Sequence, residues 1–215
     1  SNIFSGQDSF VVKYNNVGTQ QWMYLNDEFG TDTATAITTD ADGNVYVTGK
    51  QNSQELTTLN LSGDDDVFVI KLDANNGQKI DSVEFGATDN DFGQGIAVAS
   101  DGNIIVASHE DGHFKLQKLD SNDLSSSLWS YDFGDLGVGS KIGNIVTEGG
   151  RIYVTGSSNN SLTGGGSELA SPIGDLDNFI IALDDLGNSA SADWTKFLGT
   201  DSTDQNAGVT FSNGK

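Results

Sequence analysis

The chain contains no cysteine, one proline and very few cationic residues. Without cysteine, neither disulfides nor thiolate-bound metals can contribute to the structure. Ten Lys and Arg residues stand against 31 Asp and Glu, which gives a formal net charge of −21. Phosphate backbones and anionic membrane surfaces repel so acidic a chain, which argues against nucleic-acid binding. A single arginine also excludes a sialidase-like arginine triad within this chain.

Long apolar runs and helical patterns are missing too. No segment has the length and hydrophobicity of a transmembrane helix, so no membrane insertion is expected. No capped segment with a 3.6-residue period is present either. Instead, apolar residues alternate in strands such as 68–72, as a strand with one buried face requires. Together with 27 glycines, this alternation predicts a turn-rich, all-β fold.

One pattern of four segments recurs four times, at spacings of roughly 45 to 65 residues. The first segment contains Phe10, Phe68, Phe114 and Phe179, and the second contains Trp22, Ile80, Trp129 and Trp194. Such self-similarity, with four short strands per unit, is typical of a β-propeller. We expect the Phe and Trp positions to be buried. The copy at 113–120 aligns only after a one-residue slip, which predicts a β-bulge there.

The expected architecture is one all-β domain, residues 1–215, forming a β-propeller of four antiparallel blade repeats. The repeats are phased approximately at 7–63, 64–111, 112–175 and 176–215, with the last completed by residues 1–6. Residues 3–6 resemble the end of the strand that the last copy lacks, so pairing of the two termini would close the ring. A fragment of a larger propeller would show the same complementarity. Both interpretations, and the number of blades in the native ring, stay open.

Three copies carry an aspartate five residues before the apolar residue of the third segment, at Asp32, Asp91 and Asp204, and the other copy has Ser140. One interpretation places these carboxylates around a central channel as a ring of negative charge. Because they recur with the repeat, we expect them to serve the blades by accepting hydrogen bonds from turn amides.

The sharpest charge cluster is formed by Asp64, Asp65 and Asp66, in a glycine-containing loop. Three adjacent carboxylates repel one another unless they are solvated or neutralised, and Ca²⁺ prefers oxygen ligands of this kind. These three residues are therefore the candidate metal site, with Ca²⁺ as the ion. Their spacing is not that of a known Ca²⁺ loop, so we favour a solvated loop.

The two histidines, His109 and His113, flank Glu110, Asp111 and Gly112. This spacing suits a transition metal on a helix, but a short loop between strands gives it no fixed geometry. No Ser-His-acid triad and no phosphate-binding glycine loop before a helix is recognisable. No catalytic or cofactor-binding residue is therefore assigned.

The segments Asp-x-Phe-Val-x-Lys-x-Asp, Trp, Asp-x-x-Ala-x-Ala-Ile and Asp-Gly-Asn-Val-Tyr-Val-Thr-Gly together resemble the bacterial β-propeller repeat of SBBP type. Residues 32–49 and 66–73 carry the resemblance best, and 113–156 carry it least. Such repeats are typical of large secreted or surface-exposed bacterial proteins, so the resemblance implies an extracellular or cell-surface location. It supplies no catalytic motif. Residues 72–77 are more weakly similar to quinoprotein propeller repeats.

The favoured function is that of a non-catalytic extracellular β-propeller module of a large bacterial surface or secreted protein, for adhesion, display or ligand binding. One alternative is a Ca²⁺-stabilised carbohydrate-binding propeller, in which Tyr24 or Tyr131 stacks on sugars. The other is a fragment of a quinoprotein-like or hydrolytic enzyme. An unknown protein or a carbohydrate is the expected partner, and the oligomeric state stays open.

Overall fold

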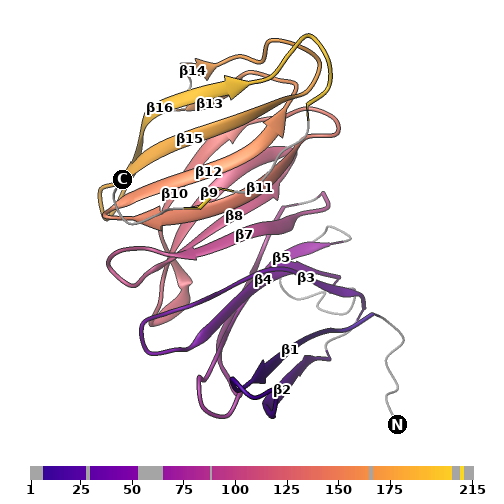
Figure 1. Cartoon of the computed structure of the whole chain (residues 1–215), viewed down its shortest axis with the longest axis vertical. Helices are drawn as coiled ribbons and strands as arrows, with labels where there is room; N and C mark the ends of the chain where they lie inside the picture. The colour runs from indigo at the N-terminus through magenta and orange to yellow at the C-terminus, as the bar shows by residue number, and fades with distance from the viewer. Residues whose placement is uncertain are drawn as a thin grey trace.

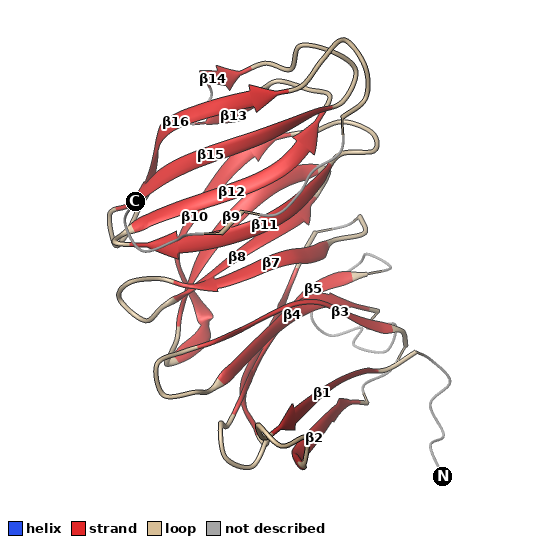
Figure 2. Cartoon of the chain, viewed as in Figure 1, coloured by secondary structure: helices blue, strands red, loops and turns tan. Residues whose placement is uncertain are grey.

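The computed structural model describes residues 7–27, 30–52, 65–87, 89–164, 167–204 and 209–210. Within these ranges all regular elements are strands (Figure 2). The predicted all-β fold class is confirmed. None of the described segments is a helix long and apolar enough to cross a membrane.

The described strands form three four-stranded antiparallel sheets and two hairpins. The first hairpin consists of β1 (Ser9–Tyr14) and β2 (Gln20–Asn26). The first sheet contains β3 (Asp32–Thr39), β4 (Val45–Gln51), β5 (Asp66–Leu72) and β6 (Lys79–Phe85). The second contains β7 (Phe92–Val98), β8 (Ile104–Glu110), β9 (His113–Asp120) and β10 (Asp123–Gly134). The third contains β11 (Lys141–Glu148), β12 (Arg151–Ser158), β15 (Asp177–Asp185) and β16 (Ala190–Leu198), and the hairpin β13 (Leu162–Gly164) and β14 (Ser167–Ala170) is inserted after β12.

The hairpin β1–β2 is termed blade 1, and the three sheets are termed blades 2, 3 and 4 in chain order. Strands β3, β7 and β11 are neighbours along the inner edge, and the blades follow one another along the long axis (Figure 1). Blades 1 and 4 therefore lie at opposite ends, and the described strands form an open arc. Residues 1–6 and 211–215, on which the predicted closure depends, lie outside the described residues.

Hydrophobic clusters fill the interfaces between successive blades, and these interfaces are termed seams. Trp22 of blade 1 packs in one cluster with Phe68 of blade 2. Val69 of blade 2 packs with Val106 of blade 3. Phe179 of blade 4 belongs to a third, larger cluster with blade 3. Each seam buries apolar side chains from both blades, so a blade depends on its neighbours for its core.

The predicted alignment of the Trp position is wrong by one residue in blade 2. Strand pairing sets Trp22 opposite Lys13, and it sets Asp81 opposite the equivalent Lys71. Ile80, which the sequence alignment placed there, is exposed. Because side chains alternate between the two faces of a strand, a one-residue shift moves a side chain to the other face.

The bulge predicted at 113–120 is absent from the pairing of β9 with β8, which is regular. Lys115 takes the position of Phe68 in this pairing, and the irregularities lie between β9 and β10. Phe114 therefore points to the face opposite to that of Phe68, where it stacks on Phe133 with 4.5 Å between ring centroids.

The predicted burial of the Phe and Trp positions holds inside the arc and fails at its ends. Phe68, Phe179, Trp22 and Trp129 are buried. Phe10 in blade 1 is 65% exposed, however, and Trp194 in blade 4 is 36% exposed. Both face away from the rest of the arc, where no described blade covers them.

A β-bulge recurs in every inner strand, where the pairing passes over Thr35, Gln94 and Gly143. The Thr35 hydroxyl donates to the carbonyl oxygen of Gly93 on the next inner strand, at 2.6 Å. The main-chain N–H of Ile142 donates to the Gln94 side-chain oxygen at 3.1 Å. The bulges thus turn these side chains toward the following blade and link the inner strands.

Candidate functional site

Two of the repeated aspartates join successive blades through their main chain. The N–H groups of Asp32, Asp91 and Asp204 each donate to a carbonyl oxygen at 2.7 Å, and the acceptors are Gln7, Asp65 and Leu176 respectively. Each acceptor immediately precedes another recurring aspartate, at Asp8, Asp66 and Asp177 respectively. The bond at Asp32 anchors the start of β3 to blade 1, and the bond at Asp91 anchors the start of β7 to blade 2, whereas the bond at Asp204 lies within blade 4.

The side chains of these aspartates bind turn amides. The buried Asp91 carboxylate accepts from the N–H of Asp111 at 2.8 Å and from the N–H of Ala87. Asp204 accepts from the N–H of Thr200 at 2.7 Å. In the copy with Ser140, the hydroxyl instead donates to the carbonyl of Leu136. The predicted hydrogen-bonding role is confirmed for the two aspartates.

In blades 1, 2 and 3, a lysine and the residue opposite it on the outer strand bind the following blade. The Lys13 ammonium and the Trp22 indole both donate to the carbonyl oxygen of Ala74, at 2.6 and 3.2 Å. At the next seam, Lys71 donates to the carbonyl of Ser121 at 2.8 Å. Asp81, in the Trp position, accepts from the Leu124 N–H at 2.9 Å.

The third seam, between blades 3 and 4, contains a charged lysine and two carboxylates. Lys118, whose side chain is fully buried, contacts the carboxylates of Asp101 at 2.7 Å and Asp185 at 2.6 Å. The Trp129 indole donates to the second oxygen of Asp185 at 3.3 Å. Burial alone would lower the pKa of Lys118, but its bonds to the two carboxylates outweigh burial and raise that pKa above 10.5. The ammonium therefore stays charged inside the seam.

The acidic loop is only partly described, since Asp64 lies outside the described residues. Asp65 pairs with the Lys50 ammonium at 2.5 Å, and Asp66 is buried at the start of β5. Within the described ranges, no three His, Asp or Glu side chains are placed to hold a metal together. An ammonium already neutralises Asp65, which favours the loop without a metal.

The two histidines have separate partners. Asp111 and Gly112, with φ of 52° and 78°, form the tight turn between β8 and β9. His109 stacks on Phe92 with ring centroids 5.0 Å apart. His113 pairs through Nδ1 with the Asp132 carboxylate at 2.9 Å.

An open cleft of about 510 Å³ lies beside this turn. Phe92, His109, Asp111 and His113 line one side of it, and the segment from Asp135 to Ser140 lines the other. Val138 stands at the rim and is 93% exposed. The cleft thus brings the Phe92–His109 stack, a second imidazole and two carboxylates together around one open hollow.

The lengths of the connections explain why a hollow forms here. Blade 2 joins its second and third strands through residues 52–65, and blade 4 does so through residues 159–176. Blade 3 uses only the two-residue turn Asp111-Gly112. The turn of blade 3 is short and leaves the space beside it open.

Sequence reasoning missed this cleft. One signal for it was available, because Gly134, Gly137 and Gly139 crowd together at the end of β10 and in its connection to β11, and all three have positive φ. The aromatic residues suggested for sugar stacking lie elsewhere. Tyr24 faces blade 2, and Tyr131 packs against Phe133 with centroids 4.7 Å apart.

Antiparallel four-stranded sheets, arranged in an arc with repeated contacts between them, are the arrangement expected of β-propeller repeats. Residues 22–56 match the SBBP family, described as a beta-propeller repeat. The resemblance inferred from the sequence is thereby confirmed, and this segment is a repeat of that family. The match spans β2, β3 and β4, which belong to blades 1 and 2.

Two relatives extend the comparison. The chain is 25% identical over 241 residues to the "Regulatory protein FlaEY" of Caulobacter vibrioides, which covers 98% of this chain and 25% of that protein. It is 39% identical over 57 residues to an uncharacterized WD repeat-containing protein of Acanthamoeba polyphaga mimivirus, which covers 26% of this chain and 4% of that protein. The chain therefore spans about a quarter of the first relative's length.

Proposed function

We propose that the chain is a non-catalytic, ligand-binding β-propeller module of a large bacterial surface or secreted protein. Blades are a scaffold, and on repeat scaffolds function resides where the repeat is broken. The observation that carries the proposal is that the Lys, Trp and Asp positions of the repeat serve packing within and between blades, whereas the cleft at His109 and His113 surrounds the two-residue turn Asp111-Gly112, which blades 2 and 4 replace with longer connections.

A carbohydrate is the ligand class that fits the cleft best. Asp111 and Asp135 offer acceptors for hydroxyl groups and disfavour anionic ligands by repulsion. The Phe92–His109 stack offers an apolar surface beside them. The acidity of the chain and its SBBP repeat are consistent with an extracellular or cell-surface location.

Binding of the labelled chain to an array of neutral and acidic glycans tests the proposal. We expect binding to neutral glycans that is lost in His113→Ala and in Val138→Glu. Both side chains are accessible, so neither change should unfold the protein. Asp123→Asn, at the exposed start of β10 and beyond the end of β9 that lies farthest from the cleft, is the matched control and should bind as the parent does.

Absence of binding to every glycan, or equal binding by the cleft variants and the parent, would overturn the assignment of a carbohydrate site to this cleft. Thermal unfolding of each variant confirms that the blades remain folded during the measurement.

A further inference from the structure

The face of blade 1 that points away from blade 2 is apolar and exposed. Lys13 and Trp22 point toward blade 2, so their strand neighbours point outward. The outward residues and their exposed fractions are Phe10 (65%), Tyr14 (59%), Met23 (57%) and Leu25 (43%). So many large apolar side chains on one hairpin mark an interaction surface. This set is termed the leading face.

Every other blade with the same pattern has this face covered. In the register of the repeat, Phe10 and Tyr14 correspond to Phe68 and Leu72 of blade 2. Phe68 and Leu72 are buried against blade 1, and Phe179 and Leu183 of blade 4 are buried against blade 3. The leading face is therefore the kind of surface that a preceding blade covers.

The opposite end of the arc presents the complementary kind of surface, termed the trailing face. It comprises Ile180 on β15 with Trp194 and Leu198 on β16, and Leu198 is 61% exposed. The equivalents of Ile180 and Leu198 in blade 2 are Val69 and Phe85, which pack against blade 3.

Trp194 holds the position of the two seam tryptophans. Trp22 and Trp129 donate their indole N–H groups to the turn of the following blade, at Ala74 and Asp185. In the described part of the chain, Trp194 has no such acceptor. The turn of blade 1 is complementary, because nothing lies within 4 Å of a Cβ built on Gly18, whereas Trp22 covers the corresponding Gly77.

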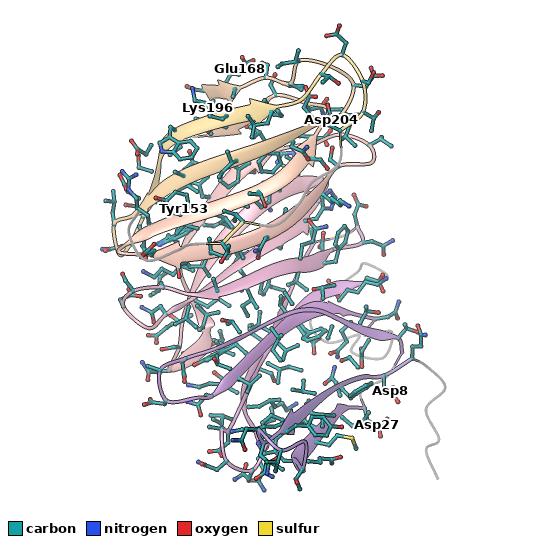
Figure 3. The ribbon with its side chains drawn as sticks, in the orientation of Figure 1. Asp8, Asp27, Tyr153, Glu168, Lys196 and Asp204 are labelled. Carbon is teal, nitrogen blue, oxygen red and sulfur yellow. The ribbon has the colours of Figure 1, made fainter. Side chains whose placement is uncertain are left out.

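Electrostatics permit the two faces to meet despite the net charge of −21. Strands β1 and β2 contain no carboxylate. At the trailing end, Asp184 and Asp193 are both paired with Arg151, at 3.1 and 2.7 Å. Lys196 adds a cation there, at the end of the molecule opposite Asp8 and Asp27 (Figure 3).

We propose that the leading face of one copy of this chain packs on the trailing face of a second copy, head to tail, in the geometry of the internal seams. Trp194 of one copy then contacts the turn at Gly18 of the next, as Trp22 contacts the turn at Gly77. Such a heterologous contact closes into a ring or continues as a filament, according to the curvature of the arc.

Sedimentation and light scattering at moderate salt, which screens the net charge, test the proposal. The parent should self-associate with increasing concentration. The double variant Phe10→Asp with Met23→Asp, and separately Leu198→Asp, should each be monomeric. A mixture of the two should form a one-to-one complex, because each variant still supplies one intact face. Ile173→Asp, at an exposed loop position outside both faces, should assemble as the parent does.

A parent that stays monomeric at all concentrations overturns the proposal. A mixture that stays monomeric overturns it as well, as does self-association that survives either face variant. Circular dichroism of each variant separates loss of the contact from loss of folding, since all substituted side chains are exposed.

Discussion

Lys118 of blade 3 reaches across the seam to Asp185 of blade 4, with 2.6 Å between Nζ and Oδ2. The same ammonium contacts Asp101 of its own blade at 2.7 Å. The lysine thus neutralises two carboxylates inside the largest core of the molecule. In the other seams, the equivalent lysines bind main-chain carbonyls, so this seam depends most on a buried charge.

We expect Lys118→Met to destabilise the protein by about 3 kcal/mol, the lower end for a broken buried ion pair. Asp185 would be left buried without a cation, whereas Asp101, with 43% of its side chain exposed, stays in contact with water. The free energy of unfolding in urea measures the effect. The double variant Lys118→Met with Asp185→Leu should recover part of the loss, and no recovery would contradict the ion-pair explanation.

The pH dependence of stability should show the contribution of the Lys118 ion pairs. The pKa of Lys118 is raised, so its contribution is complete below the unfolded value of 10.5 and is lost as the pH rises through the higher folded value. For Asp101, burial raises the pKa, but bonds from Lys118 and Asn103 outweigh burial and lower it below 3.8. Its contribution is complete above 3.8 and is lost as the pH falls through the folded value. Urea titrations should show both losses in the parent and a weaker alkaline loss in Lys118→Met.

The tryptophans should differ in their effect on stability although they share one position in the repeat. Trp22→Ala should cost about 3 to 5 kcal/mol, because the ring is buried in the first seam. Trp194→Ala, at the partly exposed trailing face, should cost about 1 kcal/mol in the monomer. Thermal unfolding at low concentration distinguishes them. Equal losses would mean that blade 4 is covered in solution.

The repeat pattern predicted which elements form and which side chains fill the inner seams. Phe68 and Phe179 are buried as expected, and Asp91 binds turn amides as expected. The pattern could not predict that Asp81 takes in blade 2 the position that Trp22 has in blade 1. The face to which a side chain points depends on strand register, and a short sequence alignment does not determine the register to one residue.

The repeat pattern also could not predict the exposure of side chains at the two ends of the arc or the position of the cleft, for a different reason. Trp194 has the sequence of a seam residue, but its burial depends on a neighbouring blade that the repeat itself does not supply. The cleft lies between the Asp111-Gly112 turn and the segment from Asp135 to Ser140, which come together only when the chain is folded.

Calcium should stabilise the protein no more than sodium does at equal ionic strength. The Lys50 ammonium lies 2.5 Å from Asp65 and would repel a divalent cation from that carboxylate. Both salts should raise the melting temperature by screening 31 acidic residues. A clear excess stabilisation by Ca²⁺, abolished by Asp65→Asn, would instead support the candidate site at residues 64–66.

Gly77→Ala should destabilise the protein more than Gly102→Ala. Both glycines have positive φ, at 69° and 85°, so each alanine costs about 1 to 2 kcal/mol of backbone strain. A Cβ at Gly77 would also lie 2.5 Å from the Trp22 ring, whereas nothing lies within 4 Å of one at Gly102. Displacing the indole should add about 1 to 3 kcal/mol, as overpacking of a core does. Urea unfolding measures the two losses of stability. When both glycine variants are made in a Trp22→Ala background, Gly77→Ala should cost no more than Gly102→Ala, because the ring that clashes is then gone. A difference that persists without the ring would show that the seam contact is not its cause.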